Sequence, residues 1–418
     1  MNAMVKASPA SKPGRWRARA MFAGLLVVGL VAVTLLSGWS SFGSRAQGER
    51  LQRLQHSPQW HDGMFVNPQG SWGDTRSALL RMFEQVPGDV PQSPVPVVRT
   101  DPALLAAAAP VGLRVTWFGH SSSLVQIDGV NVLTDPLWSD RPSPLSWLGP
   151  KRWYAPPIAL ADLPRIDAVV ISHDHYDHLD RATILAMRAW NTVFVVPLGV
   201  GAHLASWGIP ESRIRELDWW QSTRVGAIDI HATPARHHTG RLSPQTDKTL
   251  WAGYALVGPA HRAYYSGDTG FFPGMADIGR RLGPFDVAMV ESGQYDADWP
   301  DWHLGPEQAV ETSRLVQAKV LVPVHWGLIK LAHHTWTEPV ERVLAAASCR
   351  GVSVRTPQPG LPLDLGAGAR TARWWPDQAW VTAAERPIVA TRNGIANERF
   401  ALANCSATAA NRPQEATQ

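Results

Sequence analysis

The segment 172–180 holds the densest group of metal-binding side chain types in the chain, Ser172-His173-Asp174-His175-Tyr176-Asp177-His178-Leu179-Asp180. Imidazole and carboxylate groups are ligands that zinc and other borderline divalent metals accept. His173 and His175 are two residues apart, so both side chains can point to one side of an extended loop. Asp177 and His178 follow at the start of a helix and can face a second ion. The H-x-H-x-D-H spacing therefore predicts two half-sites in one loop.

Further ligands stand where apolar segments end: His237 after AIDIHATPAR, Asp268 in SGDTG, and His325 in KVLVPVHWG. Three histidines and a carboxylate around one ion, and two histidines and two carboxylates around the other, would leave room for a bridging hydroxide. We expect Asp268 to contact both ions, and we expect Asp177 and Asp268 to take part in catalysis. Two Zn²⁺ ions about 3.5–4 Å apart would lower the pKa of that water and clamp both oxygens of a displacement reaction.

Other histidines compete for these roles. His238 directly follows His237 and is the alternative ligand, which we rank second. His120 and Asp135 also follow apolar segments; a supporting role beside the ligands and a packing role suit them equally, so both are left out of the ligand set. Seven further histidines are expected to be solvated or structural: His56, His61, His203, His231, His261, His333 and His334.

The elements that must position these residues follow from the apolar pattern. From about Val111, apolar runs of four to seven residues alternate with turn signals, as strands do. Helical patterns lie between the later runs, at 180–190, 271–283, 305–318 and 337–347. Asp180 suits the N-cap of the first, and Pro306 suits the first turn of the third. This arrangement predicts an α+β fold with two sheets and helices on the outside.

The N-terminus carries a membrane signal, because Met21–Trp39 contains no charged residue and is about long enough to cross a bilayer as a helix. Five basic residues and no acidic residue precede it. The positive-inside rule then keeps the N-terminus in the cytoplasm, which predicts a single-pass protein of the inner (cytoplasmic) membrane with its catalytic domain on the periplasmic or extracellular side. The alternative is a signal peptide cleaved near Ser44-Arg45-Ala46, followed by secretion.

The remaining chain divides by composition. We assign 1–40 to the basic N-terminus and membrane segment, 41–105 to a linker and N-terminal arm, 106–369 to the hydrolase domain, and 370–418 to a loose C-terminal tail. Residues 1–50 contain seven basic residues and one acidic residue, a net charge of +6, so a whole-chain charge of +4 leaves −2 for the rest. This distribution argues against a nucleic-acid partner. Two cysteines, Cys349 and Cys405, exclude a cysteine-rich metal site and leave their pairing open.

On these residues the chain resembles the metallo-β-lactamase superfamily, whose hallmark is H-x-H-x-D-H. More narrowly, it resembles N-acylphosphatidylethanolamine-hydrolysing phospholipase D and its bacterial relatives over about residues 57–354. The matching segments are 115–120 (VTWFGH), 133–136 (LTDP), 149–152 (GPKR), 216–220 (ELDWW), 283–286 (GPFD) and 325–327 (HWG). The resemblance implies a four-layer αββα sandwich with the metals at one edge, preceded here by the transmembrane helix.

The resemblance also implies roles for individual residues. It assigns His173, His175 and His237 to one zinc ion, Asp177, His178 and His325 to the other, and Asp268 to both. It implies a catalytic or substrate-orienting role for His303, in the segment WHLGPE. The expected reaction is phospholipase D-type hydrolysis of N-acylphosphatidylethanolamine or a related phospholipid through a metal-bound hydroxide.

The expected partners are therefore a phospholipid substrate and the membrane; a homodimer is compatible with the sequence, which leaves the oligomeric state open. Three alternatives remain at this stage. They are a lactone or amide hydrolase of the same fold, a nuclease-like phosphodiesterase, and a metal-binding scaffold without turnover. The intact ligand set argues against the scaffold.

Overall fold

The structure is a computed structural model, and it describes residues 14–81, 84–109, 112–241, 246–365 and 371–402. Its centre is a pair of mixed β-sheets. The seven-stranded sheet runs, in spatial order, β15 (Pro362–Asp364), β3 (Leu113–Gly119), β4 (Ser122–Ile127), β5 (Val130–Thr134), β6 (Ala168–Val170), β7 (Val193–Pro197) and β8 (Ile214–Leu217). The six-stranded sheet runs β14 (Leu321–Val324), β13 (Val287–Glu291), β12 (Arg262–Tyr265), β11 (Gly253–Val257), β10 (Ile228–Thr233) and β9 (Ser222–Val225).

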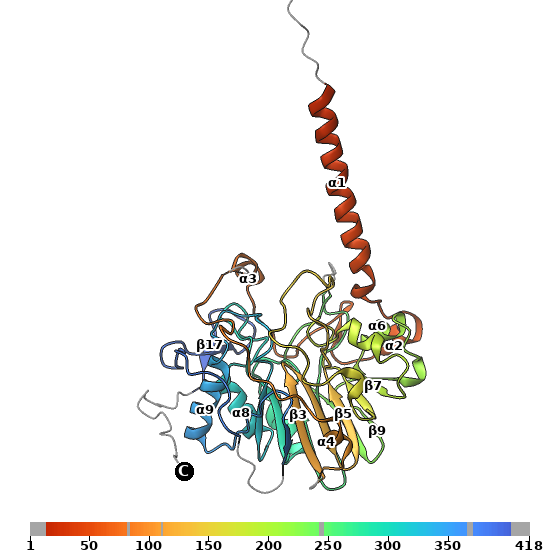
Figure 1. The fold of residues 1–418 in the computed structure, drawn as a ribbon. Coiled ribbons are helices and arrows are strands. Elements are labelled where there is room, and N and C mark those ends of the chain that lie inside the picture. The colour runs from red at the N-terminus through yellow and green to blue at the C-terminus, as the bar shows by residue number, and fades with distance from the viewer. Residues whose placement is uncertain (1–13, 82–83, 110–111, 242–245, 366–370, 403–418) are drawn as a thin grey trace, which may run out of the picture.

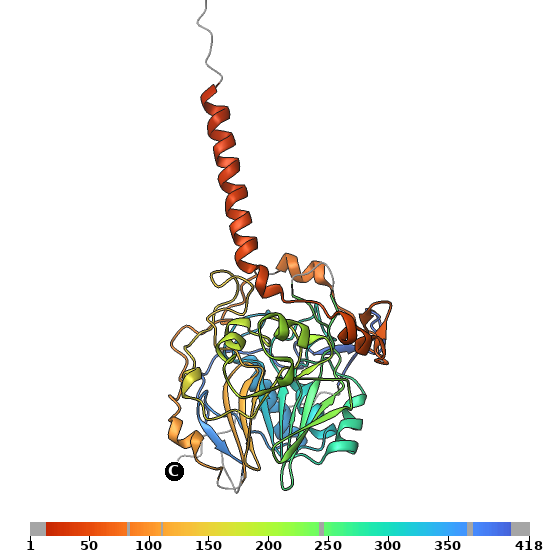
Figure 2. The ribbon, with the colours of Figure 1, turned by 90° about the vertical axis from the view of Figure 1, so that its right-hand side faces the viewer.

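The two sheets face each other, and helices cover their outer faces (Figure 2). Val125 and Ile127 of β4 pack with Ile230 of β10 in the apolar layer between the sheets. Leu124, which points to the opposite face of β4, packs instead with Ile184 of a covering helix. Such strands are buried on both faces, which explains why they appear in the sequence as continuous apolar runs. The predicted four-layer αββα fold is confirmed.

Among the described residues, four helices of the outer layers fall in the expected helical stretches, and one, at residues 200–206, lies outside them. The seven-stranded sheet is covered by α5 (Arg181–Ala186) and α6 (Val200–Ser206), and the six-stranded sheet by α7 (Gly274–Leu282), α8 (Pro306–Leu315) and α9 (Glu338–Arg350). Asp180 caps α5 by accepting a hydrogen bond from the backbone N–H of Ala182 at 3.2 Å. Pro306 lies in the first turn of α8. Both local predictions are confirmed.

The remaining short elements lie mostly in the N-terminal arm. They are α2 (Gly48–Gln55), β1 (Trp60–His61), β2 (Met64–Phe65), α3 (Thr75–Arg81), α4 (Pro102–Ala106) and the 3₁₀ turns η1 (Ser40–Phe42), η2 (Leu160–Asp162) and η3 (Glu211–Arg213). The arm is fixed to the domain by ion pairs, since Arg50 and Arg53 both contact the buried carboxylate of Glu216, at 2.7 and 2.6 Å.

The first helix, α1 (Gly14–Trp39), extends away from the domain (Figure 1). Its segment Trp16–Thr34 has a mean hydropathy of 1.6, and none of it is buried against the protein. By length and composition this helix could serve as a membrane span or as a signal segment.

The C-terminal segment differs from the expected loose tail, because residues 371–402 pack against the domain. Trp374 stacks on Trp326 with ring centroids 5.3 Å apart, and Trp375 is buried beside it. A hairpin of β16 (Val389–Thr391) and β17 (Arg399–Ala401) follows. These contacts join residues far apart in the chain and leave no periodic pattern in the sequence. Cys405, and with it the pairing of the two cysteines, lies outside the described residues.

Trp326 is central to this packing, so its removal should destabilise the domain. Its ring also stacks on Trp117 at 5.3 Å, and only 1% of the residue is exposed. We expect Trp326→Ala to lower the free energy of unfolding by about 3–5 kcal/mol through lost burial and a residual cavity. Denaturant titration would measure this. Trp147→Ala, at a position 60% exposed, is the control and should change stability by less than about 0.5 kcal/mol. Equal losses in the free energy of unfolding in both variants would contradict the central role of Trp326 in this packing.

Candidate metal centre

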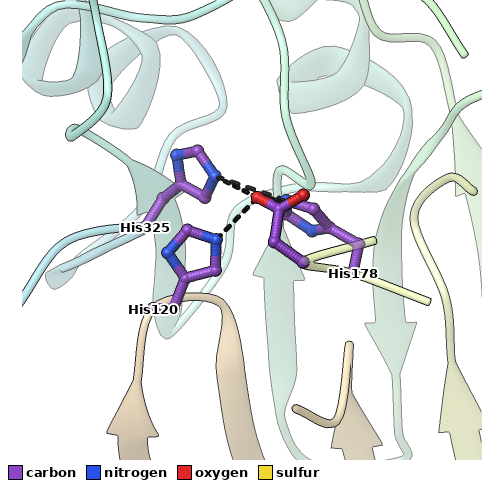
Figure 3. A group of neighbouring side chains, drawn as sticks. His120, His178 and His325 are labelled. Carbon is purple, nitrogen blue, oxygen red and sulfur yellow. Dashed lines mark hydrogen bonds and ion pairs between the residues drawn. The ribbon is translucent and has the colours of Figure 1, made fainter. Parts of the chain in front are cut away.

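The predicted ligands come together at one edge of the sandwich, just beyond the ends of strands from both sheets. His173 follows β6, His237 follows β10, Asp268 follows β12 and His325 follows β14. Strands of a sheet that run in the same direction end at the same edge, which brings the loops that follow them close together. His120 follows β3 at the same edge, where His120, His178 and His325 point toward one another (Figure 3).

The first group consists of His173, His175 and His237, as the sequence predicts. The Nδ1 atom of His175 lies 2.9 Å from Nε2 of His173 and 3.4 Å from Nε2 of His237. One nitrogen from each ring therefore faces a common point. Zinc binds imidazole nitrogen at about 2.0–2.1 Å in tetrahedral sites, which spaces two such ligand atoms roughly 3.3 Å apart. The group fits such a metal ion.

The second group consists of Asp177, His178 and His325, joined by His120. The Nε2 atoms of His178 and His325 are 3.3 Å apart, and Oδ2 of Asp177 lies 3.3 and 3.6 Å from them. Nε2 of His120 lies 2.9 Å from the same carboxylate oxygen. The structure thus brings the three predicted ligands together and places His120 in contact with Asp177.

Asp268 lies between the two groups. Its Oδ2 atom is 3.0 Å from Nε2 of His178 and 3.2 Å from Nε2 of His325, and 3.8 Å from Nε2 of His173 in the first group. Its Oδ1 atom is buried and has no hydrogen-bond partner among the described residues. A buried carboxylate oxygen without a partner is costly, and a cation would satisfy it. The donor set therefore fits divalent metal, with Asp268 placed to serve both groups.

The electrostatics of the cluster favour a bound cation. Burial, together with neighbouring imidazoles, holds the pKa of His173 and that of His237 well below the ordinary value, so both rings are neutral. Burial opposes ionisation of Asp268, but His178 and His325 outweigh it and hold the carboxyl pKa well below its usual range. Burial would likewise lower the pKa of His325, yet Asp268, Asp177 and Glu291 raise it to about 10. A divalent cation would displace the proton that these carboxylates hold on His325, because it brings two positive charges to the same carboxylates.

Asp135 supports the ligands from behind. Its Oδ2 atom accepts a hydrogen bond from Nδ1 of His178 at 2.7 Å, and its Oδ1 atom accepts the backbone N–H of Ser172 at 2.7 Å. The hydroxyl groups of Ser172 and Tyr265 also donate to Oδ2. A carboxylate on the far ring nitrogen fixes the tautomer and leaves Nε2 free for the metal. Of the two roles open for Asp135, the structure supports the one beside the ligands.

Glu291 is the residue that sequence reasoning missed. It is fully buried at the end of β13, and its Oε2 atom lies 2.8 Å from Nδ1 of His303 and 3.3 Å from Nδ1 of His325. Its Oε1 atom accepts the backbone N–H groups of Thr269 and Leu304. One carboxylate therefore orients two site histidines. The available signal was an acidic residue closing the apolar run FDVAMVE, as Asp268 closes its own.

His303 lies beside both groups and is partly open to solvent. Its Nδ1 atom is 3.7 Å from Oδ2 of Asp268, its ring stacks on His325 at 5.1 Å between centroids, and 15% of its side chain is exposed. Because Nδ1 donates to Glu291, Nε2 is the nitrogen left for a substrate. The ring can therefore donate a proton to, or hydrogen-bond, a group bound near Asp268.

The structure favours His237 over His238 as the ligand. Nδ1 of His237 donates to the carbonyl of Trp302 at 2.7 Å, which leaves Nε2 for the first group. The ring of His238 lies against Trp302 instead, at 4.3 Å between centroids. Three histidines expected to lie outside the ligand set pair with carboxylates, namely His203 with Asp174 of the ligand segment, His261 with Asp128 and His333 with Asp296.

Comparison with known proteins agrees with this geometry. Residues 130–326 match the family model of the beta-lactamase superfamily domain. The N-acyl-phosphatidylethanolamine-hydrolyzing phospholipase D 1 of Caenorhabditis elegans is 36% identical over 290 residues, which cover 63% of this chain and 80% of the relative. The chain belongs to the metallo-β-lactamase superfamily. It is a metal-dependent hydrolase by family and fold.

Two further known proteins are similar to this chain. An uncharacterized protein of Mycobacterium tuberculosis is 48% identical over 332 residues, covering 77% of this chain and 88% of the relative. Among solved structures, the metallo hydrolase Igni18 of Ignicoccus hospitalis is 25% identical, with a TM-score of 0.48 over 60% of this chain and 97% of that one.

The position of Asp268 predicts the effect of its removal. Purified protein should contain bound divalent metal, because the donor set fits such ions. Asp268→Ala should lower the metal content measured by elemental analysis and abolish turnover. His238→Ala, which changes a neighbouring ring outside both groups, should retain the metal. Full metal content and activity in Asp268→Ala would contradict the shared-ligand assignment.

Glu291→Gln tests whether the carboxylate of Glu291 orients the site histidines. The amide keeps the shape of the side chain but loses the negative charge that orients His303 and His325. We expect metal affinity to fall about 10–100-fold, as is typical when a group that orients a ligand is removed. Competition with a chromophoric chelator would measure it. Glu311→Gln, on α8, is the matched control, because this carboxylate pairs with Arg314 and Arg350 and not with site residues. It should leave the affinity unchanged; an equal affinity in both variants would refute the role of Glu291.

Proposed function

We propose that this protein is a binuclear zinc phosphodiesterase of the phospholipase D type, acting on N-acylphosphatidylethanolamine or a related glycerophospholipid. The observation that carries the proposal is the placement of His303, held by Glu291, 3.7 Å from the carboxylate that joins the two ligand groups. The sequence similarity to the Caenorhabditis elegans phospholipase supports the substrate class.

The described residues divide the work of such a reaction. When bound, a metal pair supplies an activated water and neutralises charge on phosphoryl oxygens. Asp135 and Glu291 hold the ligand rings in fixed orientations, which keeps the site preorganised. We expect Nε2 of His303 to donate a proton to the departing alkoxide, with the ring oriented by the carboxylate of Glu291 at Nδ1. The products are phosphatidic acid and an N-acylethanolamine.

The apolar helix α1 supports a membrane location for this chemistry. An anchored enzyme meets lipid at high local concentration, so a modest head-group site suffices. The basic residues that precede the apolar run favour an N-terminus in the cytoplasm and a catalytic domain on the opposite side of the membrane. Phospholipid and bilayer are thus the proposed partners.

His303→Ala tests the catalytic proposal. We expect the rate of phosphatidic acid release from N-acylphosphatidylethanolamine in detergent micelles to fall by about a hundredfold or more, a typical loss for a general acid. Metal content should be retained, because His303 lies outside the predicted ligand set. His261→Ala, whose ring pairs with Asp128 away from the site, is the control and should keep full activity. A fully metallated enzyme that leaves all phospholipids intact, yet opens lactones or cuts nucleic acid, would overturn the proposal.

A reporter fused after residue 60 tests the orientation. Alkaline phosphatase folds only outside the cytoplasm, so we expect it to be active at this junction because the basic flank holds the N-terminus inside. A cytoplasmic reporter at the same junction should be inactive, and activity there would refute the orientation. An isolated protein whose sequence begins near Gln47 would show that the segment is a cleaved signal.

A further inference from the structure

Three separate elements carry exposed apolar side chains on the face of the domain from which α1 emerges. Trp147 and Leu148, at the tip of the loop 139–151, are 60% and 54% exposed. Leu80 of α3 is 77% exposed, and Trp39 at the end of α1 is 72% exposed. Figures 1 and 2 both show α3 on the same face of the domain as the base of α1. Water-exposed apolar side chains gathered on one face indicate an interaction surface.

The loop 139–151 touches the end of the membrane helix directly. The side chain of Leu145 lies 3.1 Å from the position that a Cβ atom would take at Gly38, in the last turn of α1. The uncharged apolar run Met21–Trp39 ends one residue later, at Trp39. The loop therefore meets α1 at the end of its apolar run. Trp147 is therefore at the depth where tryptophan is enriched, the boundary between lipid and water.

Each of the three elements is also bonded to a loop that carries site residues. Ser139 at the start of the loop 139–151 donates its N–H to Asp180, just after the ligand segment, at 3.1 Å. Arg81 at the end of α3 contacts Asp296, in the loop leading to His303, at 3.1 Å.

The third link runs from the end of α1. Arg241 donates from Nε to the carbonyl of Ser41 and from Nη1 to that of Asp174, at 2.8 and 2.6 Å. The three elements with exposed apolar side chains therefore all lie close to the edge of the sandwich that holds the metal ligands.

From these contacts we infer that the loop 139–151, together with Leu80, forms a second contact with the bilayer that α1 spans, and that it seats the domain with its metal-ligand edge toward the lipid. The inference rests on the anchoring proposed above. A few apolar side chains alone would bind a membrane weakly, but α1 keeps the bilayer at a high effective concentration, so a weak contact suffices to set the orientation. The phosphodiester of a lipid then reaches His303 without leaving the interface.

Nitroxide labels on the full-length chain test this arrangement. Leu148→Cys places a label at the proposed contact, and Val28→Cys places one in the middle of α1. Ala227→Cys places the third label at the exposed turn before β10, at the end of that strand farthest from His237. Each is reconstituted in vesicles of phosphatidylethanolamine and phosphatidylglycerol. Power-saturation electron paramagnetic resonance then compares collisions with apolar oxygen and with a water-soluble nickel chelate. The unmodified chain, treated in the same way, gives the background from native cysteines.

We expect the labels at Leu148 and Val28 to favour oxygen several-fold over the chelate, and the label at Ala227 to favour the chelate. A label at Leu148 as accessible to the chelate as that at Ala227, with Val28 still protected, would overturn the second contact and leave the anchor intact. A label at Val28 that is open to the chelate would overturn the anchoring and the inference together. Spectral broadening at Leu148 that disappears on dilution with unlabelled protein would show that the loop 139–151 contacts a second copy of the chain. That result would also overturn the contact with the bilayer. None of these readouts depends on turnover, so they are separate from the test of the proposed reaction.

Discussion

The buried carboxylate of Asp268 is the group on which the rest of the site depends. Imidazole nitrogens of His173 and His178 from one loop and of His325 from another converge on one of its oxygens, while the other oxygen lies buried without a hydrogen-bond partner among the described residues. Burying a carboxylate is costly unless positive charge compensates it. Everything around Asp268 therefore serves to hold basic ring nitrogens, and the cations that they bind, at fixed distances from this carboxylate.

The two sheets meet at this point through the backbone. The N–H of His325, after β14, donates to the carbonyl of His120, after β3, at 2.8 Å, and the N–H of His120 donates to the carbonyl of Trp326 at 3.1 Å. His120 and His325 both have positive φ, at 51° and 66°, as does Asp135 at 32°. Non-glycine residues in such conformations cost of order 1–3 kcal/mol each and persist where the surrounding structure over-determines them. The stacked tryptophans next to His325 supply that constraint, so packing energy maintains the geometry of the ligands.

The terminal segments complete the other side of the site. Asn67 of the N-terminal arm exchanges hydrogen bonds with the backbone of His237, at 2.7 and 3.2 Å. The fully buried ion pair between Arg236 and Asp301, 2.9 Å long, joins the loop of His237 to that of His303. Thr391 of the C-terminal hairpin donates its N–H to Asp301 at 2.7 Å. Removing one partner of such a buried pair would leave a charge uncompensated, so the arm and the hairpin are part of the site rather than additions to the domain.

The amino-acid sequence by itself was sufficient for the local features of this protein. Four features could be predicted without a structure, because each depends on residues close together in the chain. They are the H-x-H-x-D-H spacing, the ligands at strand ends, the N-cap at Asp180 and the apolar helix at the N-terminus. Only the tertiary structure decided how these pieces meet. It placed Asp268 between the two groups, gave Glu291 two histidines to orient, separated His237 from His238, and packed Trp374 and Trp375 of the C-terminal segment against the domain. These outcomes depend on contacts between residues far apart in the chain, and one buried acid or one tryptophan leaves no periodic signal from which such a contact can be inferred.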